Sequence, residues 1–217
     1  MLPVKCAPEP AGFDEGIRQK GIAAIDELVG RKPRISRSGP RRQAIATREC
    51  DIPADEFPPF WREALPDMLN AYDRRCAFLA LYIEHATGNP SVDHMLPKSR
   101  QWDHVYEWSN YRLCAALVNG RKKDLTGIVD PFSCKSGWFA LELVGYQVIV
   151  GPKLPASQSS QAEATLRLLN AAECCKAREE YAGCYVGRSI SLSYLERRAP
   201  FVAAELRRQG KLHPEDR

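Results

Sequence analysis

The chain has 217 residues, of which 44% are hydrophobic and 27% are charged, with a formal net charge of +4. This composition is typical of a globular protein that buries a core, and the mild basicity permits nucleic-acid binding without requiring it. No run of about 18 apolar residues is present, which excludes a membrane-spanning helix. Residues 1–15 lack the basic start and apolar stretch of a signal peptide, so we expect a cytoplasmic protein.

The N-terminal part predicts two helices joined by a basic segment. Apolar residues at helical spacing predict a helix over Asp14–Val29 that ends at Gly30. A second helix is expected over about 59–77, with Pro66 as a kink or break. Segment 31–42 between them holds six Lys and Arg residues and no acid. Its Pro and Gly residues argue against regular structure, and either a solvated linker or a basic arm over phosphates would explain it.

The middle of the chain indicates short strands and one short helix. We expect extended segments at 81–83 and 91–93 around a turn at 86–90, a strand at 111–113, a helix over 114–123 and a hairpin over 138–150 around Gly145.

The C-terminal part predicts helices. After a loop at 151–160, Ser160 and Glu163 form a capping-box pattern before a helix that continues to about 182. A last helix is expected over about 192–208, interrupted near Pro200. The fold class predicted from all these elements is α+β.

The pattern richest in chemistry runs from Ser91 to Lys123. Asp93 and His94 are adjacent, and at a strand end their side chains can diverge, one toward a metal and the other toward a substrate. On the helix that follows, Asn119, Lys122 and Lys123 would share one face. An oxygen-only pair of Asp93 and Asn119 suits Mg²⁺ or Mn²⁺, which keep several waters. A neutral imidazole beside that ion can take a proton from an attacking water.

This order of residues resembles the HNH (ββα-metal) nuclease motif, in the variant whose final His is Asn. The resemblance implies that Asp93 and Asn119 are the metal ligands and that His94 is the general base. It also implies that Asn110 orders the loop and helps to orient the base. The surrounding sequence segments VDHMLPKS, YEWSNYRL and VNGRKKD resemble those of the HNH proteins of Septu-type and retron-associated anti-phage systems. The match is strongest over residues 76–145.

From this resemblance we expect a Mg²⁺-dependent DNA endonuclease of prokaryotic anti-phage defence, working with a partner ATPase. Its ββα-metal core would span 76–124, embedded in flanking helices, with a helical region at 1–75 and a hairpin and helices at 125–217. Lys122 is expected to assist catalysis. Four further cations are candidates for nucleic-acid contact: Lys98, Arg112, Arg121 and Lys123. For Lys98 a solvated loop cation is an equal alternative, and Arg112 could instead pair with an acid.

The cysteine pattern indicates whether the chain also holds a structural zinc. The chain has eight of them, with no CxxC pair, and without an export signal we expect buried thiols rather than a disulfide framework. Many HNH proteins hold a structural zinc with two CxxC pairs. Here the matching places keep only Cys76 and Cys114, with Leu79 and Leu117 at the second positions. Two thiolates are too few for a closed site, so we expect no structural zinc and apolar packing by both leucines.

The alternative function is a non-catalytic nucleic-acid-binding or assembly subunit on the same scaffold. The C-terminal helices within 161–210 offer surface for a partner, although they could simply complete the core around a small ββα unit.

Overall fold

Seven α-helices and two small antiparallel sheets make up the main regular structure of residues 1–216, the part of the chain described by a computed structural model. The fold is therefore α+β, as predicted. The strands are β1 (Pro90–His94), β2 (Tyr111–Ala115), β3 (Phe139–Leu141) and β4 (Val148–Val150). The helices are α1 (Gln19–Leu28), α2 (Leu65–Ala71), α3 (Ala116–Lys122), α4 (Ser159–Leu169), α5 (Ala172–Val186), α6 (Leu192–Arg198) and α7 (Pro200–Arg208).

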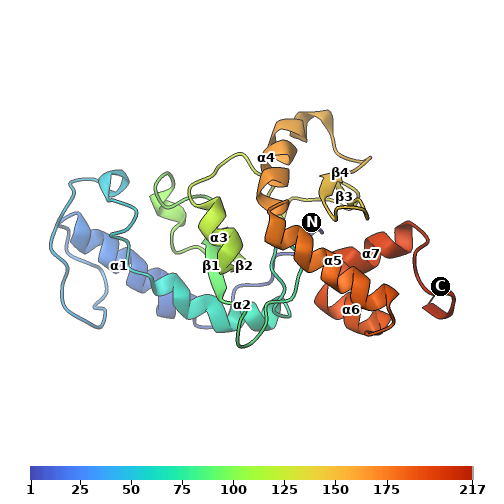
Figure 1. The fold of residues 1–217 in the computed structure, drawn as a ribbon. Helices are drawn as coiled ribbons and strands as arrows, with labels where there is room; N and C mark the ends of the chain where they lie inside the picture. Colours follow the sequence, from blue (N-terminus) through green and yellow to red (C-terminus); the bar gives the residue numbers. More distant parts are fainter. Residues whose placement is uncertain (217) are drawn as a thin grey trace.

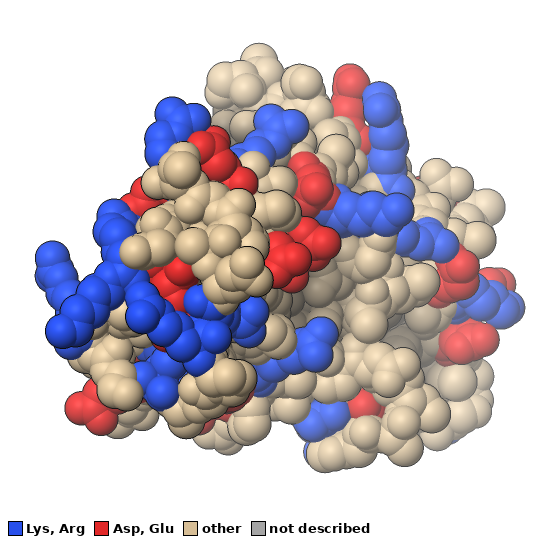
Figure 2. All heavy atoms as spheres, turned by 90° about the vertical axis from the view of Figure 1, so that its left-hand side faces the viewer, with Lys and Arg blue, Asp and Glu red and all other residues tan. Residues whose placement is uncertain are grey.

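The N-terminal part confirms the first predicted helix. A π-helical turn over Asp14–Arg18 continues directly into α1, and the chain leaves the helix at Gly30, whose φ is +76°. Segment 31–42 has no regular structure, as predicted. It lies at the α1 end of the molecule (Figure 1), on a face where many Lys and Arg side chains gather (Figure 2).

The second predicted helix is shorter than expected. A 3-10 helix over Phe60–Ala64 leads into α2, and Pro66 lies in the first turn of α2, where its missing N–H is not needed. Asp73 and Arg74 have positive φ values of 48° and 56°, which turn the chain away just after the helix ends.

The central elements follow the order β1, β2, α3. β1 pairs antiparallel with β2, with Asp93 opposite Arg112 and His94 opposite Tyr111, and α3 contacts both strands (Figure 1). The expected strand at 81–83 is wrong, because those residues make only one isolated bridge, between Arg75 and Tyr82. The expected helix starts two residues late, since β2 extends to Ala115.

The C-terminal part contains the predicted hairpin, with β3 paired antiparallel to β4. The single helix expected to reach residue 182 is instead two helices. Asn170 ends α4, and its amide group binds both the N–H and the carbonyl of Val148 on β4. The capping box is also wrong, because no side chain caps α4. The break near Pro200 is confirmed, with Pro200 in the first turn of α7.

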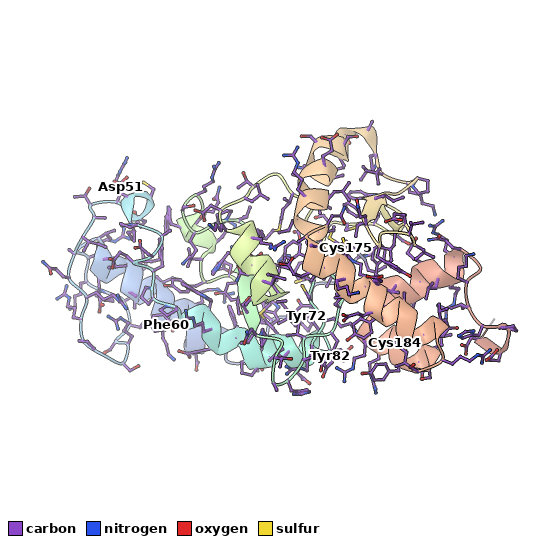
Figure 3. All side chains as sticks on the ribbon, in the orientation of Figure 1. Asp51, Phe60, Tyr72, Tyr82, Cys175 and Cys184 are labelled. Carbon is purple, nitrogen blue, oxygen red and sulfur yellow. The ribbon has the colours of Figure 1, made fainter. Side chains whose placement is uncertain are left out.

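Buried apolar side chains from all parts of the described chain belong to one cluster. The side chains fill the space between the central sheet and the C-terminal helices, where Tyr72 and Tyr82 lie (Figure 3). Among residues 1–216, none of the helices has the length and apolar content needed to cross a bilayer.

Candidate active site

The end of β1 presents two titratable neighbours to opposite faces of the sheet, because side chains alternate along a strand. Asp93 contacts Lys122 of α3, whereas the ring of His94 lies against Trp61 and Tyr111. Both residues are largely covered, with 2% of Asp93 and 8% of His94 exposed. The divergence predicted for this pair is therefore present.

Asp93 is a buried carboxylate in which only one of the two oxygen atoms has a hydrogen-bond partner. Lys122 Nζ lies 3.2 Å from Asp93 Oδ1 and donates a 2.7 Å hydrogen bond to the His94 carbonyl oxygen. Asp93 Oδ2 is buried and has no hydrogen-bond partner in the described part of the chain. Burial raises the pKa of Asp93 to about 6, although the charges of Lys122 and Arg112 act in the opposite direction.

Asn119 lies on the face of α3 that packs against β1. Its Nδ2 donates to Ser91 Oγ at 3.1 Å and to the Val92 carbonyl oxygen at 3.3 Å, which fixes the amide against β1 just before Asp93. No residue in the described range donates a hydrogen bond to Asn119 Oδ1. Lys122 follows one helical turn later, so the amide and the ammonium group approach the same stretch of strand.

His94 is held as a neutral imidazole with one defined tautomer. Its Nε2 lies 2.9 Å from the carbonyl oxygen of Val105, which only accepts, so Nε2 carries the proton and Nδ1 is unprotonated. Burial lowers the pKa of His94 to about 4, and the charges of Lys98 and Lys122 add to this while the Val105 carbonyl opposes it. The ring is therefore neutral at pH 7.

Trp61 and Lys98 lie over the His94 side of the sheet. The Trp61 ring meets the His94 ring edge-on, with centroids 4.9 Å apart, and Lys98 Nζ lies 4.3 Å from the Trp61 ring centroid. Burial lowers the pKa of Lys98, whose side chain is half-buried. Trp61 belongs to the 3-10 helix before α2. No local motif in the sequence indicated its position, because the contact joins segments more than 30 residues apart.

Asn110 holds the loop between β1 and β2. Its Oδ1 accepts from Leu96 N at 2.7 Å, while its Nδ2 donates to the carbonyl oxygens of Leu96 and His104 at 3.1 and 2.9 Å. Its backbone carbonyl also accepts from Met95 N. This side chain is 3% exposed, so it ties down the loop that carries Val105 and does not reach a substrate directly.

The remaining predicted cations divide by exposure. Lys123 is exposed, and Arg121 is exposed and forms an ion pair with Glu173. Arg112 is buried and binds Asp130 with both Nε and Nη2, at 2.8 and 2.6 Å, with its guanidinium 3.5 Å from the Phe132 ring centroid. The alternative of pairing with an acid is thus the one observed for Arg112.

The prediction that Lys122 assists catalysis also needs a correction, because Lys122 is not placed to contact a substrate. Its side chain has no exposed surface and is engaged by Asp93 and by the His94 carbonyl. A phosphate group therefore does not reach Lys122 in this arrangement. Arg112 is also buried, so the prediction that it contacts nucleic acid is wrong for this arrangement.

The two cysteines at the positions that match a zinc site do come together, since Ala77 N, next to Cys76, donates to the carbonyl oxygen of Leu113, next to Cys114. Leu79 is buried as predicted, but the prediction for Leu117 is wrong, because 45% of it is exposed on α3. In residues 1–216, no three His, Cys, Asp or Glu side chains gather as a metal site of those residue types would require.

Comparison of the chain with models of protein families, with curated proteins and with solved structures finds no match. The functional argument therefore rests on the residues and geometry of this site.

Proposed function

We propose that the protein is a metal-dependent endonuclease that hydrolyses phosphodiester bonds in DNA. The observation that carries this proposal is the grouping at the end of β1. A buried Asp93 keeps one carboxylate oxygen without a partner, and Asn119, whose amide oxygen accepts no hydrogen bond from a described residue, is bound to Ser91 and Val92 of the same strand. The next residue, His94, is a neutral imidazole with Nδ1 unprotonated.

These residues fit a single hard cation. Lys122 meets only Oδ1 of Asp93, while the buried Oδ2 has no hydrogen-bond partner and burial raises the pKa. A divalent ion at Oδ2 would favour the charged carboxylate. Asp93 and Asn119 would hold Mg²⁺ or Mn²⁺ through oxygen atoms, leaving other positions to water and phosphate. When bound, the ion would offset the negative charge that develops on the phosphate during hydrolysis.

His94 would act as the general base. The Val105 carbonyl keeps the proton on Nε2, so Nδ1 is the atom that would accept a proton from water. A pKa near 4 makes a buried imidazole a weak base. The negative charge of an approaching phosphate would raise this pKa toward its ordinary value, which favours proton transfer only when substrate is present.

Lys122 and Trp61 would have supporting roles. Lys122 fixes Asp93 from the side opposite the orphaned oxygen. Trp61, together with Lys98, covers the imidazole, so the proposal requires these side chains to move aside when DNA binds. Lys98 then provides a cation beside the attacked phosphate.

The test is cleavage of plasmid DNA with Mg²⁺, after EDTA treatment and metal add-back. We expect His94→Ala to lose about 10²- to 10⁴-fold in rate, the usual contribution of a general base, while its DNA affinity stays unchanged. His85→Ala is the matched control, because His85 is exposed and binds only Tyr82. Equal cutting by the wild type and His94→Ala would end the assignment of His94 as base.

A second candidate function is supported by one observation. The Asp93–Lys122 ion pair and the cover over His94 also describe a closed scaffold that binds nucleic acid or a protein partner without catalysis. DNA binding without cleavage in Mg²⁺ or Mn²⁺, by a protein purified alone or with its partner, would favour this candidate.

We also propose a role in anti-phage defence with a partner ATPase, on the resemblance of the 91–124 motif words alone. Co-purification of an ATPase with the tagged protein from its native host is the test, and recovery of the protein alone would argue against an obligate complex.

A further inference from the structure

Two cysteines that the proposed hydrolysis does not use meet at the edge of the central sheet. Cys76 follows α2 by a short turn, and Cys114 lies in β2. Backbone hydrogen bonds from Cys76 N to Leu81 O and from Ala77 N to Leu113 O hold the two segments side by side, at 2.9 and 2.8 Å. Both cysteines are buried, and they lie close enough for each thiol to affect the pKa of the other.

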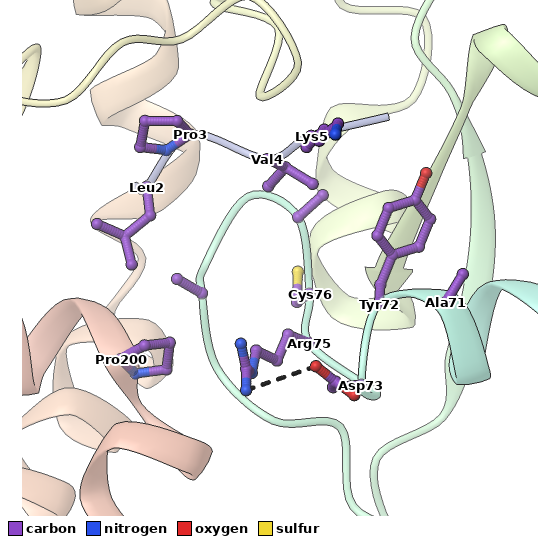
Figure 4. A pocket seen from close by; sticks show the side chains of 12 residues that line it. Leu2, Pro3, Val4, Lys5, Ala71, Tyr72, Asp73, Arg75, Cys76 and Pro200 are labelled. Carbon is purple, nitrogen blue, oxygen red and sulfur yellow. Dashed lines mark ion pairs between the residues drawn. The ribbon is translucent and has the colours of Figure 1, made fainter. Parts of the chain in front are cut away.

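A pocket of about 250 Å³ gives one of the two thiols a route to small molecules. Cys76 lines it, together with the N-terminal segment 2–5, the Asp73–Arg75 ion pair and Pro200 (Figure 4). Cys114 does not line this pocket and is fully buried in β2. The geometry therefore separates the pair into an approachable thiol and a sheltered one.

The local hydrogen bonds give the two thiols different chemistry. Burial acts to raise the pKa of Cys76, but hydrogen bonds from the Cys114 thiol and from the backbone N–H groups of Ala115, Leu79 and Phe78 outweigh it and lower the pKa to about 7. Burial and the neighbouring Cys76 raise the pKa of Cys114 well above its ordinary value. The thiolate is the nucleophile, so Cys76 is the member that reacts first.

We propose that Cys76 and Cys114 form a redox-modification site in which a peroxide oxidises Cys76 and Cys114 resolves the product. The Cys76 thiolate attacks one oxygen of hydrogen peroxide and the O–O bond breaks, giving Cys76 sulfenic acid and, after protonation, water. The Cys114 sulfur then attacks the Cys76 sulfur, and the S–O bond breaks with release of a second water. Two thiols are oxidised to one disulfide while one peroxide is reduced.

The disulfide would form next to the candidate metal site. Cys114 pairs with Ser91 across the sheet, and the Ser91 hydroxyl both donates to the Cys114 carbonyl oxygen and accepts from Asn119. The site stands on contacts that do not depend on the proposed nuclease activity, so it can hold or fail separately.

The test is titration of the reduced, folded protein with hydrogen peroxide, followed by alkylation and peptide mass spectrometry. We expect one cross-linked peptide pair joining Cys76 and Cys114, lighter by two hydrogen atoms, formed before the exposed Cys184 on α5 (Figure 3) is oxidised. In Cys114→Ser, dimedone should trap sulfenic acid at Cys76. In Cys76→Ser, Cys114 should stay reduced. Cys134→Ser is the control, because Cys134 is a buried thiol away from this pair, and it should behave as wild type.

The proposal would be overturned if peroxide modified Cys6, Cys50 and Cys184 while Cys76 stayed reduced, or if Cys76 and Cys114 linked only after unfolding in urea. Circular dichroism of each variant checks its fold, and the peptide map of the wild type decides the question even if a serine variant fails to fold.

Discussion

At the scale of single residues, Asp93 and His94 at the end of β1 are both buried, and burial disfavours the charged form of each side chain. Asp93 has a raised pKa and His94 a lowered one, and burial is the largest cause in each case. Protonation of His94 would place a charge in this buried site and so destabilise the folded protein. The site therefore has a measurable effect on stability as well as on catalysis.

The pH dependence of stability should show the burial of His94. Its pKa is lowered from 6.5 to about 4 in the folded protein, so between these pH values the unfolded chain binds more protons. Stability from this group is therefore present above pH 6.5 and is lost as the pH falls toward 4. Urea denaturation at pH 7 and pH 4.5 should show a loss up to about 3 kcal/mol larger in the wild type than in His94→Gln. Parallel losses in both proteins would contradict the buried, neutral ring.

The sequence identified the residues that carry chemistry but not the residues that surround them. Asp93, His94, Asn110 and Asn119 lie within one motif, and their types and spacing predicted a strand that carries Asp93 and a helix that carries Asn119, which are in contact. Trp61 and Asp130 come from other segments, and contacts between distant segments leave no local pattern. The two alternatives for Arg112 could not be separated without the position of Asp130.

At the scale of elements, the loop between β1 and β2 determines how the base is held. Val105 lies in this loop and accepts the His94 proton donor, and Asn110 ties the loop to the end of β1. Asn110 thus acts on His94 through the backbone around it.

Replacement of Asn110 by Ala should loosen this loop. The substitution removes three side-chain hydrogen bonds and leaves a Leu96 N–H and two carbonyl groups without their partner. At about 1 kcal/mol for each bond, the free energy of unfolding should fall by about 2–4 kcal/mol. Chemical denaturation measures this, with Gln43→Ala as the control, because Gln43 is an exposed amide outside regular structure. A change below about 0.5 kcal/mol would show that the loop is held by other contacts.

Element types were more predictable than element ends and pairings. Apolar spacing located α1, β-branched and aromatic residues around Gly145 located the β3–β4 hairpin, and the α6–α7 pair was predicted as a helix interrupted near Pro200. The ends of α2 and α4 depend on positive φ values at 73–74 and on the contact of Asn170 with β4, which are tertiary features. Similarly, the partner of β1 is β2 and not the nearer segment 81–83, which makes only an isolated bridge with Arg75.

At the scale of the whole molecule, the positive charge is unevenly distributed. Lys32, Arg34 and Arg41 in the basic segment are exposed and form no ion pair with a described residue. Arg37 is different, because it is buried in an ion pair with Glu27 that fixes the segment on α1. Arg31 at the start of the segment pairs with Asp26 and Glu49, and the Arg42 N–H at its end also binds Glu27. The segment is therefore held to α1 at both ends and at Arg37, with exposed cations between these points, as a phosphate-binding arm would be.

Replacing Lys32, Arg34 and Arg41 together by Gln should weaken DNA binding and its salt dependence. Each lost phosphate contact lowers the slope of log affinity against log salt by about 0.9, so the slope should fall by about 2 to 3. The control is Gln at Lys135, Lys153 and Lys211, exposed cations of the C-terminal half, with the same change in net charge. Equal slopes for the two triple variants would show that the basic segment is a solvated linker and not a phosphate-binding arm.

Binding of Mn²⁺ to the protein, followed by electron paramagnetic resonance, tests the central claim most directly. The account predicts one tightly bound Mn²⁺ per chain, weakened at least about tenfold by Asp93→Asn and also weakened by Asn119→Ala. Binding should be unchanged in His94→Ala and in Asp124→Asn, an exposed acid after α3. Absence of Mn²⁺ binding, or equal binding by the wild type and Asp93→Asn, would contradict it.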